Sequence, residues 1–138
     1  IRDEADEMHE KFVQAQEAAD RHHDDFVRVH KRLRELDLYA MRGITEAAER
    51  TGARACVTGG SAIFRIHMKE RPPRDFREAY LSPEEKDRLQ TLLDHLFDAG
   101  FIMINTCTAA LSTPMTEVEI DALVAAIGEG FEKIAKMP

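Results

Sequence analysis

The chain has 138 residues, enough for one compact domain and too few for two of ordinary size. Apolar residues make up 43% and charged residues 33%, which is typical of a folded globular protein and argues against a disordered one. The net charge is −7, with 19 Lys and Arg against 26 Asp and Glu. This balance argues against a protein that binds nucleic acid by neutralising phosphates.

The sequence also limits the cellular setting that we expect. No apolar stretch approaches the length of a membrane span, and the charged first residues do not resemble a signal peptide. The two cysteines, Cys56 and Cys107, are too few for a disulfide framework, so we expect buried thiols in a reducing cytoplasm. The chain begins without Met in a charged, helix-like register, and we expect it to be part of a longer protein.

The first part of the chain predicts helix. Apolar or small residues recur in alternating steps of four and three from Met8 through Phe26 to Ala40, which places one stripe on one helix face. The pattern fits one long helix or two helices broken near residues 22–25, and it ends at Gly52, a typical C-terminal signal. A free-standing coiled coil is possible, but strand-like sequence follows directly and favours a packed amphipathic helix.

After Gly52 the period changes from helix to strand. Residues 53–57 and 61–68 predict two short strands around a tight glycine turn at residues 59–61. Residues 69–80, with two prolines and several charges, predict a loop. Within the second strand, charged and apolar residues alternate in the order Phe64, Arg65, Ile66, His67 and Met68.

Two later helices have clear starts. Ser82 and Glu85 fit a capping box, as do Thr116 and Glu119, and Pro83 suits the first helical position. The apolar faces of the two helices are Leu89, Leu92, Leu93, Leu96 and Phe97, and Ile120, Leu123, Val124, Ile127, Phe131 and Ile134.

Between these helices, residues 101–104 and 108–112 predict two strands joined through residues 105–107. The predicted fold class is therefore α+β. A long N-terminal helix region precedes a small antiparallel sheet of three to four strands, which two helices back.

Few residues suggest chemistry by themselves. His22, His23 and His30 lie among aspartates, but adjacent ligands do not face one another on a helix, so surface charge is favoured over a zinc site. One cluster of basic residues is a candidate for binding a carboxylate or phosphate, although charged side chains of a solvated loop are the favoured interpretation. Its members are Arg65, His67, Lys69, Arg71 and Arg74. No nucleophile, base and oxyanion site assemble, so we predict no catalytic residue and no metal site.

The order of several segments resembles the C-terminal part of class III pyridoxal-phosphate (PLP) aminotransferases. Residues 57–68, VTGGSAIFRIHM, resemble the stretch v-t-G-x-G-S-m-f-x-i-h-f of that family. Residues 111–121, LSTPMTEVEID, resemble l-S-x-p-x-T-e-x-d-i-d, and residues 71–76 and 96–101 also match. The resemblance covers about residues 33–135 and is greatest to the glutamate-1-semialdehyde aminomutase-like group, which includes β-amino-acid aminotransferases.

This resemblance implies a small C-terminal domain at residues 33–138, preceded by a helical lead-in of uncertain origin at residues 1–32. In the family, a large domain holds PLP on a lysine, and the cofactor acts as electron sink in moving an amino group. The resemblance implies a homodimer acting on amino acids and keto acids, with the small domain covering the active site. The large domain's cofactor-binding motifs are absent from this chain, so we predict no cofactor-binding residue in it and no catalysis by it alone.

The resemblance also bears on the substrate. Some β-amino-acid aminotransferases carry a carboxylate-binding arginine in the turn that follows the strand matching residues 101–104. This chain has Asn105-Thr106-Cys107-Thr108 there, which leaves the substrate open, and Asn105 and Thr106 are its predicted substrate-facing residues. Neither the amino donor and acceptor nor the choice between mutase and transaminase is predicted.

Two alternatives belong to other functional classes. One is a non-enzymatic α+β interaction module that dimerises through the stripe of residues 8–40. The other, which ranks last, is a metal-binding regulator that uses His22, His23 and His30.

Overall fold

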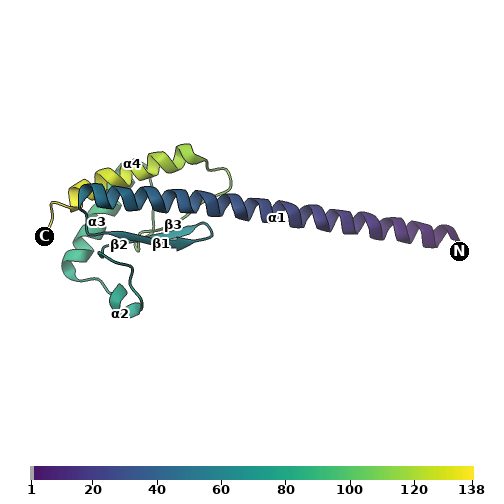
Figure 1. Cartoon of the computed structure of the whole chain (residues 1–138), viewed down its shortest axis with the longest axis horizontal. Helices are drawn as coiled ribbons and strands as arrows, with labels where there is room; N and C mark the ends of the chain where they lie inside the picture. The colour runs from purple at the N-terminus through teal and green to yellow at the C-terminus, as the bar shows by residue number, and fades with distance from the viewer. Residues whose placement is uncertain (1) are drawn as a thin grey trace. The chain divides into compact units, whose positions relative to one another are not determined.

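The computed structural model describes residues 2–138, with side chains from Asp3 onward. Figure 1 shows its elements, and the order is α1 (Arg2–Thr51), β1 (Cys56–Gly60), β2 (Ile63–His67), α2 (Phe76–Ala79), α3 (Pro83–Asp98), β3 (Thr108–Ala110) and α4 (Glu117–Ile134). The predicted α+β class, with a long N-terminal helix and an antiparallel sheet, is confirmed. The chain divides into two compact units, Ile1–Arg32 and Leu33–Pro138.

The described part of the first unit is entirely helical. The helix passes through residues 22–25 without a break. Pairs one turn apart support it, such as Lys11 Nζ donating to Glu7 Oε1 at 2.7 Å. The predicted apolar stripe is exposed here, with Met8 71%, Phe12 67% and Phe26 61% accessible.

The second unit contains one hydrophobic core. It includes buried side chains from α1, the sheet, α3 and α4, among them Leu36, Ile44, Phe64, Ile66, Leu92, Leu96, Ile127 and Phe131. Helices α3 and α4 pack closely where Gly130 meets Leu92, because a Cβ on Gly130 would lie 2.5 Å from Leu92 Cδ1. Most of the predicted helix faces are buried, but Phe97 is 68% exposed, so its assignment to the core is wrong.

The predicted signals at helix ends are confirmed. Gly52 follows α1 with φ at +70°, a conformation that glycine adopts without a steric penalty. Ser82 and Glu85 form the capping box of α3, and Thr116 and Glu119 form that of α4. The predicted loop at residues 69–80 is corrected in one respect, because it contains the short helix α2, whose N-cap Asp75 accepts from the Glu78 amide at 2.9 Å.

The three strands lie in the order β1-β2-β3, and both pairings are antiparallel. The predicted glycine turn is displaced by two residues, since Gly59 and Gly60 end β1 while Ser61 and Ala62 form the turn with φ of 59° and 107°. Glycine at position 59 lets β1 and β2 approach closely, because a Cβ there would lie 2.5 Å from the carbonyl oxygen of Ile63.

The strand predicted at residues 101–104 is wrong. Ile102 is 85% exposed and Ile104 59%, and among residues 2–138 no strand pairs with this segment. Its ends are tied locally instead, by Phe101 N–H donating to the Leu96 carbonyl at 2.8 Å and Cys107 N–H to the Ile104 carbonyl at 2.8 Å. The apolar run at residues 101–104 therefore has no sheet neighbour among the described residues to support a strand.

Both cysteines are free thiols. Cys56 begins β1 and Cys107 precedes β3, so β2 separates the two strands. Within the described part of the chain, no helix combines the length and apolar character that a membrane crossing requires.

Candidate functional site

One face of the sheet carries a row of polar side chains centred on Arg65. Because alternate residues of a strand point to opposite faces, Arg65 lies on the face opposite the buried Phe64 and Ile66. Thr58 of β1 and Thr108 of β3 are its direct cross-strand partners. The half-buried residues Thr58, Arg65 and Thr108 are called the polar row below.

His67 extends this face toward the start of β1. It is 9% exposed, and its Nε2 lies 2.8 Å from Thr58 Oγ1 in a hydrogen bond. Burial, and then the positive charge of Arg65, lower the pKa of His67 below its usual value. The imidazole is therefore held toward its neutral form, and Arg65 supplies the positive charge of the row.

The predicted substrate-facing residues lie on the turn that leads into β3, in different surroundings. Thr106 Oγ1 lies 3.0 Å from Thr108 Oγ1, which connects Thr106 to the polar row. Asn105 lines a shallow depression of about 250 Å³ together with the exposed Phe97 and Ile102. The structure thus places Thr106, and not Asn105, against the polar row.

Cys107 completes this turn in a left-handed conformation, with φ at 57°. It is fully buried, and burial raises the pKa of its thiol to about 12, with a small opposing influence from Arg65. The Cys56 thiol is half-buried, and burial raises its pKa as well. Both sulfurs are therefore protonated near neutral pH and are poor nucleophiles.

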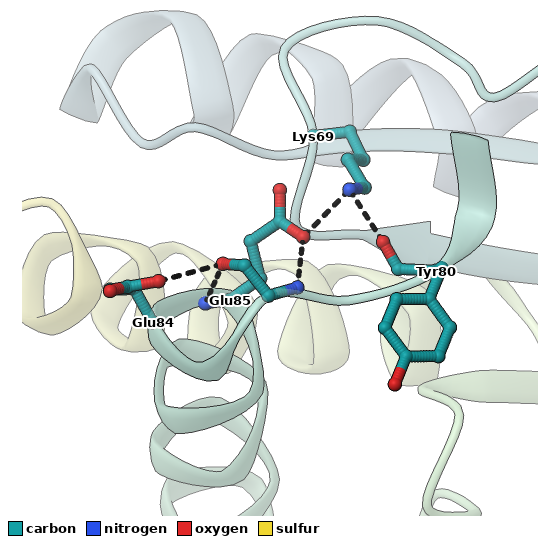
Figure 2. A network of polar contacts seen from close by, with 5 residues as sticks. Lys69, Tyr80, Glu84 and Glu85 are labelled. Atoms are coloured by element: carbon teal, nitrogen blue, oxygen red, sulfur yellow. Dashed lines mark hydrogen bonds and ion pairs between the residues drawn. The ribbon is translucent and has the colours of Figure 1, made fainter. Parts of the chain in front are cut away.

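A second polar region lies around Lys69 in the loop after β2. Its Nζ donates to Glu85 Oε2 at 2.6 Å and to the Tyr80 carbonyl at 2.9 Å, and Glu85 also accepts from the Ser82 amide at 2.9 Å (Figure 2). Burial acts to raise the pKa of Glu85, but the Lys69 and Ser82 hydrogen bonds and the charges of Lys69 and Arg88 outweigh it and lower that pKa. This network joins the loop to the start of α3.

The Lys69 network borders an open depression of about 600 Å³ whose basic side chains have partners within the chain. Arg54 pairs with Glu70 at 4.0 Å and Arg71 with Glu78 at 4.0 Å. The buried Arg88 donates to the Pro138 carbonyl at 2.7 Å. The predicted cluster of basic residues is thus not one cluster in the structure. Arg65 and His67 lie on the sheet, and Lys69 and Arg71 line this depression. Arg74 instead forms an ion pair with Glu78 at 2.6 Å.

Asp37 on α1 is a buried acid with no role in the polar row. It is 1% exposed, and neither carboxylate oxygen accepts a hydrogen bond from the residues described. Burial raises its pKa, and the amide of Ala62 opposes the rise without reaching hydrogen-bond geometry. The carboxyl group is therefore biased toward its neutral form beside the strained Ser61–Ala62 turn.

The histidines on α1 do not form a metal site in the described residues. His22, His23 and His30 are all exposed, and no group of three potential ligands lies close together anywhere in residues 2–138.

Sequence reasoning missed the polar row because cross-strand register is not local information. The alternation of Arg65 with Phe64 and Ile66 does indicate that Arg65 leaves the core. Its pairing with Thr58 and Thr108 depends on where β1 begins and on the turn at residues 61–62, and the positions of the glycines predict neither.

No family model matches the chain, and no curated protein matches it. Solved structures do match. An omega-transaminase from Sphaerobacter thermophilus is 29% identical, with a TM-score of 0.73 over 78% of this chain and 24% of its own.

Two further structures share the fold at lower identity. A transaminase with PLP bound is 22% identical, with a TM-score of 0.64 over 78% of this chain and 24% of its own. A β-phenylalanine aminotransferase from Variovorax paradoxus is 23% identical, with a TM-score of 0.64 over 70% of this chain and 22% of its own. The chain therefore spans about a quarter of the length of these transaminases and has a fold found within them.

Proposed function

We propose that residues 33–138 are the C-terminal small domain of a PLP-dependent class III aminotransferase of the glutamate-1-semialdehyde aminomutase-like group. The likeness to the S. thermophilus omega-transaminase carries this proposal, because it combines the highest TM-score of the three with a match to only a quarter of that enzyme. The aminotransferase-like segments at residues 57–68 and 111–121 support the finer assignment.

The residues of this chain do not fit PLP on their own. Lys69 Nζ is held by Glu85 and the Tyr80 carbonyl, Lys86 lies 5.4 Å from the centre of the Tyr80 ring, and Lys133 contacts His95 at 2.9 Å. None of these three amines is free in a cavity, as a cofactor-bound lysine requires. Under the proposal, the cofactor is held by a large domain outside residues 1–138.

The role of this chain is then to cover the active site, shape the substrate channel and exclude water during amino transfer. Asn105 and Thr106 face the substrate, an amino acid or keto acid. The proposal includes a cytoplasmic homodimer and leaves residues 1–32 as a helical lead-in. Exposed Phe97, Ile102 and Ile104 support it, because a domain that packs on a larger one presents apolar surface when seen alone.

A second candidate is a non-enzymatic module that dimerises through α1. The exposure of Met8, Phe12 and Phe26 favours it, since these residues follow the four-and-three spacing of a helix-pairing seam. The stripe is interrupted by Ala15, Ala19 and His22, and its later residues Leu36 and Ala40 are buried in the core of the second unit. This candidate therefore ranks second.

Two measurements on the native protein, isolated from its source, distinguish the two candidates. Intact mass and an absorbance scan between about 320 and 450 nm, where bound PLP absorbs, are measured before and after adding amino donors. A polypeptide several times this length, or a copurifying large chain, with a band that the donors bleach supports the aminotransferase. A native chain of 138 residues with no band and no partner contradicts it and leaves the α1 module.

A further inference from the structure

Arg65 is a positive charge without a counter-charge in the described structure. Within residues 2–138, no hydrogen bond or ion pair joins its guanidinium to another residue, and its Nε is buried without an acceptor. Other arginines are paired, such as Arg50 with Glu132 at 3.2 Å and Arg74 with Glu78 at 2.6 Å. Such a buried donor calls for an acceptor from outside these residues, which an ion, a ligand or a water molecule can supply.

The surroundings of Arg65 define what that partner is. Strand alternation places no acid on this face of the three strands, whose outward residues are Cys56, Thr58, Gly60, Ile63, Arg65, His67, Thr108 and Ala110. Directly opposed residues have Cβ atoms about 5 Å apart, so an anion held by the guanidinium also lies within reach of the Thr58 and Thr108 hydroxyls. The arrangement favours a small anion that accepts several hydrogen bonds.

The row is also continuous with the turn proposed to face the substrate. Thr106 Oγ1 contacts Thr108 Oγ1 at 3.0 Å, so a molecule touching Thr106 lies next to the residue opposite Arg65. The planar guanidinium matches a carboxylate, with two parallel donors for two oxygens. Amino acids and keto acids both present that group.

We propose that Arg65, Thr58 and Thr108 form the site that binds a carboxylate of the substrate, with Arg65 as its anchor. The inference rests on the proposed function, since it names the substrate group that this domain recognises. A carboxylate could also come from an acidic side chain of the same longer protein, and the experiment distinguishes these two sources.

The test uses the whole holoenzyme in wild-type, Arg65→Gln and Arg65→Lys forms. Arg71→Gln is the matched control, because Arg71 is an exposed arginine beside the other depression. Ligand-observed NMR gives the Kd for propionate, a bare carboxylate, and for propanol, which lacks one. Initial rates give KM for pyruvate and for butanal as amino acceptors, each with a saturating amine donor that has no carboxylate.

We expect Arg65→Gln to weaken propionate binding and to raise the KM for pyruvate by roughly 10- to 100-fold, as expected for losing a charge-assisted bidentate contact. Propanol binding stays within about twofold, and the KM for butanal rises far less than that for pyruvate. Arg65→Lys recovers part of the affinity, and Arg71→Gln resembles wild type.

Three results overturn the inference. One is a wild-type enzyme that does not bind propionate, and another is an equal effect of Arg65→Gln on propionate and propanol. The third is an Arg65→Gln variant with a lower denaturation midpoint and unchanged propionate affinity. That result would show that the partner of Arg65 is an acidic side chain of the protein. Propionate binding at Arg65 in a protein without bound PLP would contradict the proposed function alone.

Discussion

The two faces of strand β2 contrast sharply although they share five residues of sequence. Phe64 and Ile66 on one face are at most 1% exposed and belong to the helix-covered core. On the other face, Ile63 is exposed and Arg65 is half-buried, and Arg65 has no partner in the described residues. The first face therefore lies in the core, and the second carries the proposed carboxylate site.

The contrast predicts that changes on the two faces affect different measurements. A change on the core face alters the free energy of unfolding, because it leaves a cavity that the surrounding residues fill only in part. A change in the polar row alters ligand affinity with a smaller effect on stability, because its groups are only half-buried.

The largest expected effect is that of Phe64→Ala. This substitution removes a ring that is 0% exposed, so we expect the free energy of unfolding to fall by about 3–5 kcal/mol in chemical denaturation. Ile63→Ala, on the opposite face and 56% exposed, is the control and should cost less than about 1 kcal/mol. Similar losses for the two variants would contradict the assignment of faces.

Gly59→Ala is expected to have the next largest effect. The new Cβ would lie 2.5 Å from the Ile63 carbonyl oxygen and 2.8 Å from Phe64 Cα, so the strands must move apart at a cost of about 1–3 kcal/mol. Gly60→Ala is the matched control, since a Cβ at that position would have no atom within 4 Å. Comparing thermal midpoints of the two variants checks the register, and equal midpoints would argue against it.

Asp37→Asn tests the carboxyl group that is buried on α1. Because burial raises the folded-state pKa of Asp37 above its unfolded value, its stabilising contribution is present at low pH and is lost as the pH rises through the folded pKa. We expect Asp37→Asn to gain about 1 kcal/mol at pH 7 and less near pH 4, measured by urea denaturation. A loss of stability at pH 7 would show that the ionised carboxylate has a favourable partner.

The smallest expected effect belongs to His67. Burial and Arg65 lower its folded-state pKa, so its contribution is present above the unfolded pKa of about 6.5 and is lost as the pH falls through the folded value. As the pH falls, we expect the titration of His67 to lower the free energy of unfolding of the wild-type protein by less than about 1 kcal/mol. His67→Gln should remove that part of the pH dependence. Unfolding free energies measured between pH 7.5 and pH 5 for both proteins check this, and identical pH profiles would contradict the buried neutral imidazole.

The features that sequence predicted correctly are those determined by neighbouring residues. Both capping boxes, the end of α1 at Gly52 and the buried faces of α3 and α4 depend on residues within a few positions of one another. The α+β class followed from the change of period after Gly52.

The features that sequence predicted wrongly depend on distant partners. Ser61 and Ala62 form the turn, whereas Gly59 lies within β1, where a Cβ would meet Phe64 of the paired strand. The apolar residues at 101–104 form no strand because nothing in the described residues pairs with them. The polar row joins three strands, so its composition required the register of the sheet.

The most direct test of the central claim is transfer of a labelled amino group by the whole native protein. The protein is incubated with a ¹⁵N-labelled amino donor and a keto acid, and mass spectrometry follows the product amino acid. We expect ¹⁵N in that product over many turnovers, with none after borohydride reduction of the protein. The absence of labelled product across a panel of donors and keto acids, from a protein of full native length, would contradict it.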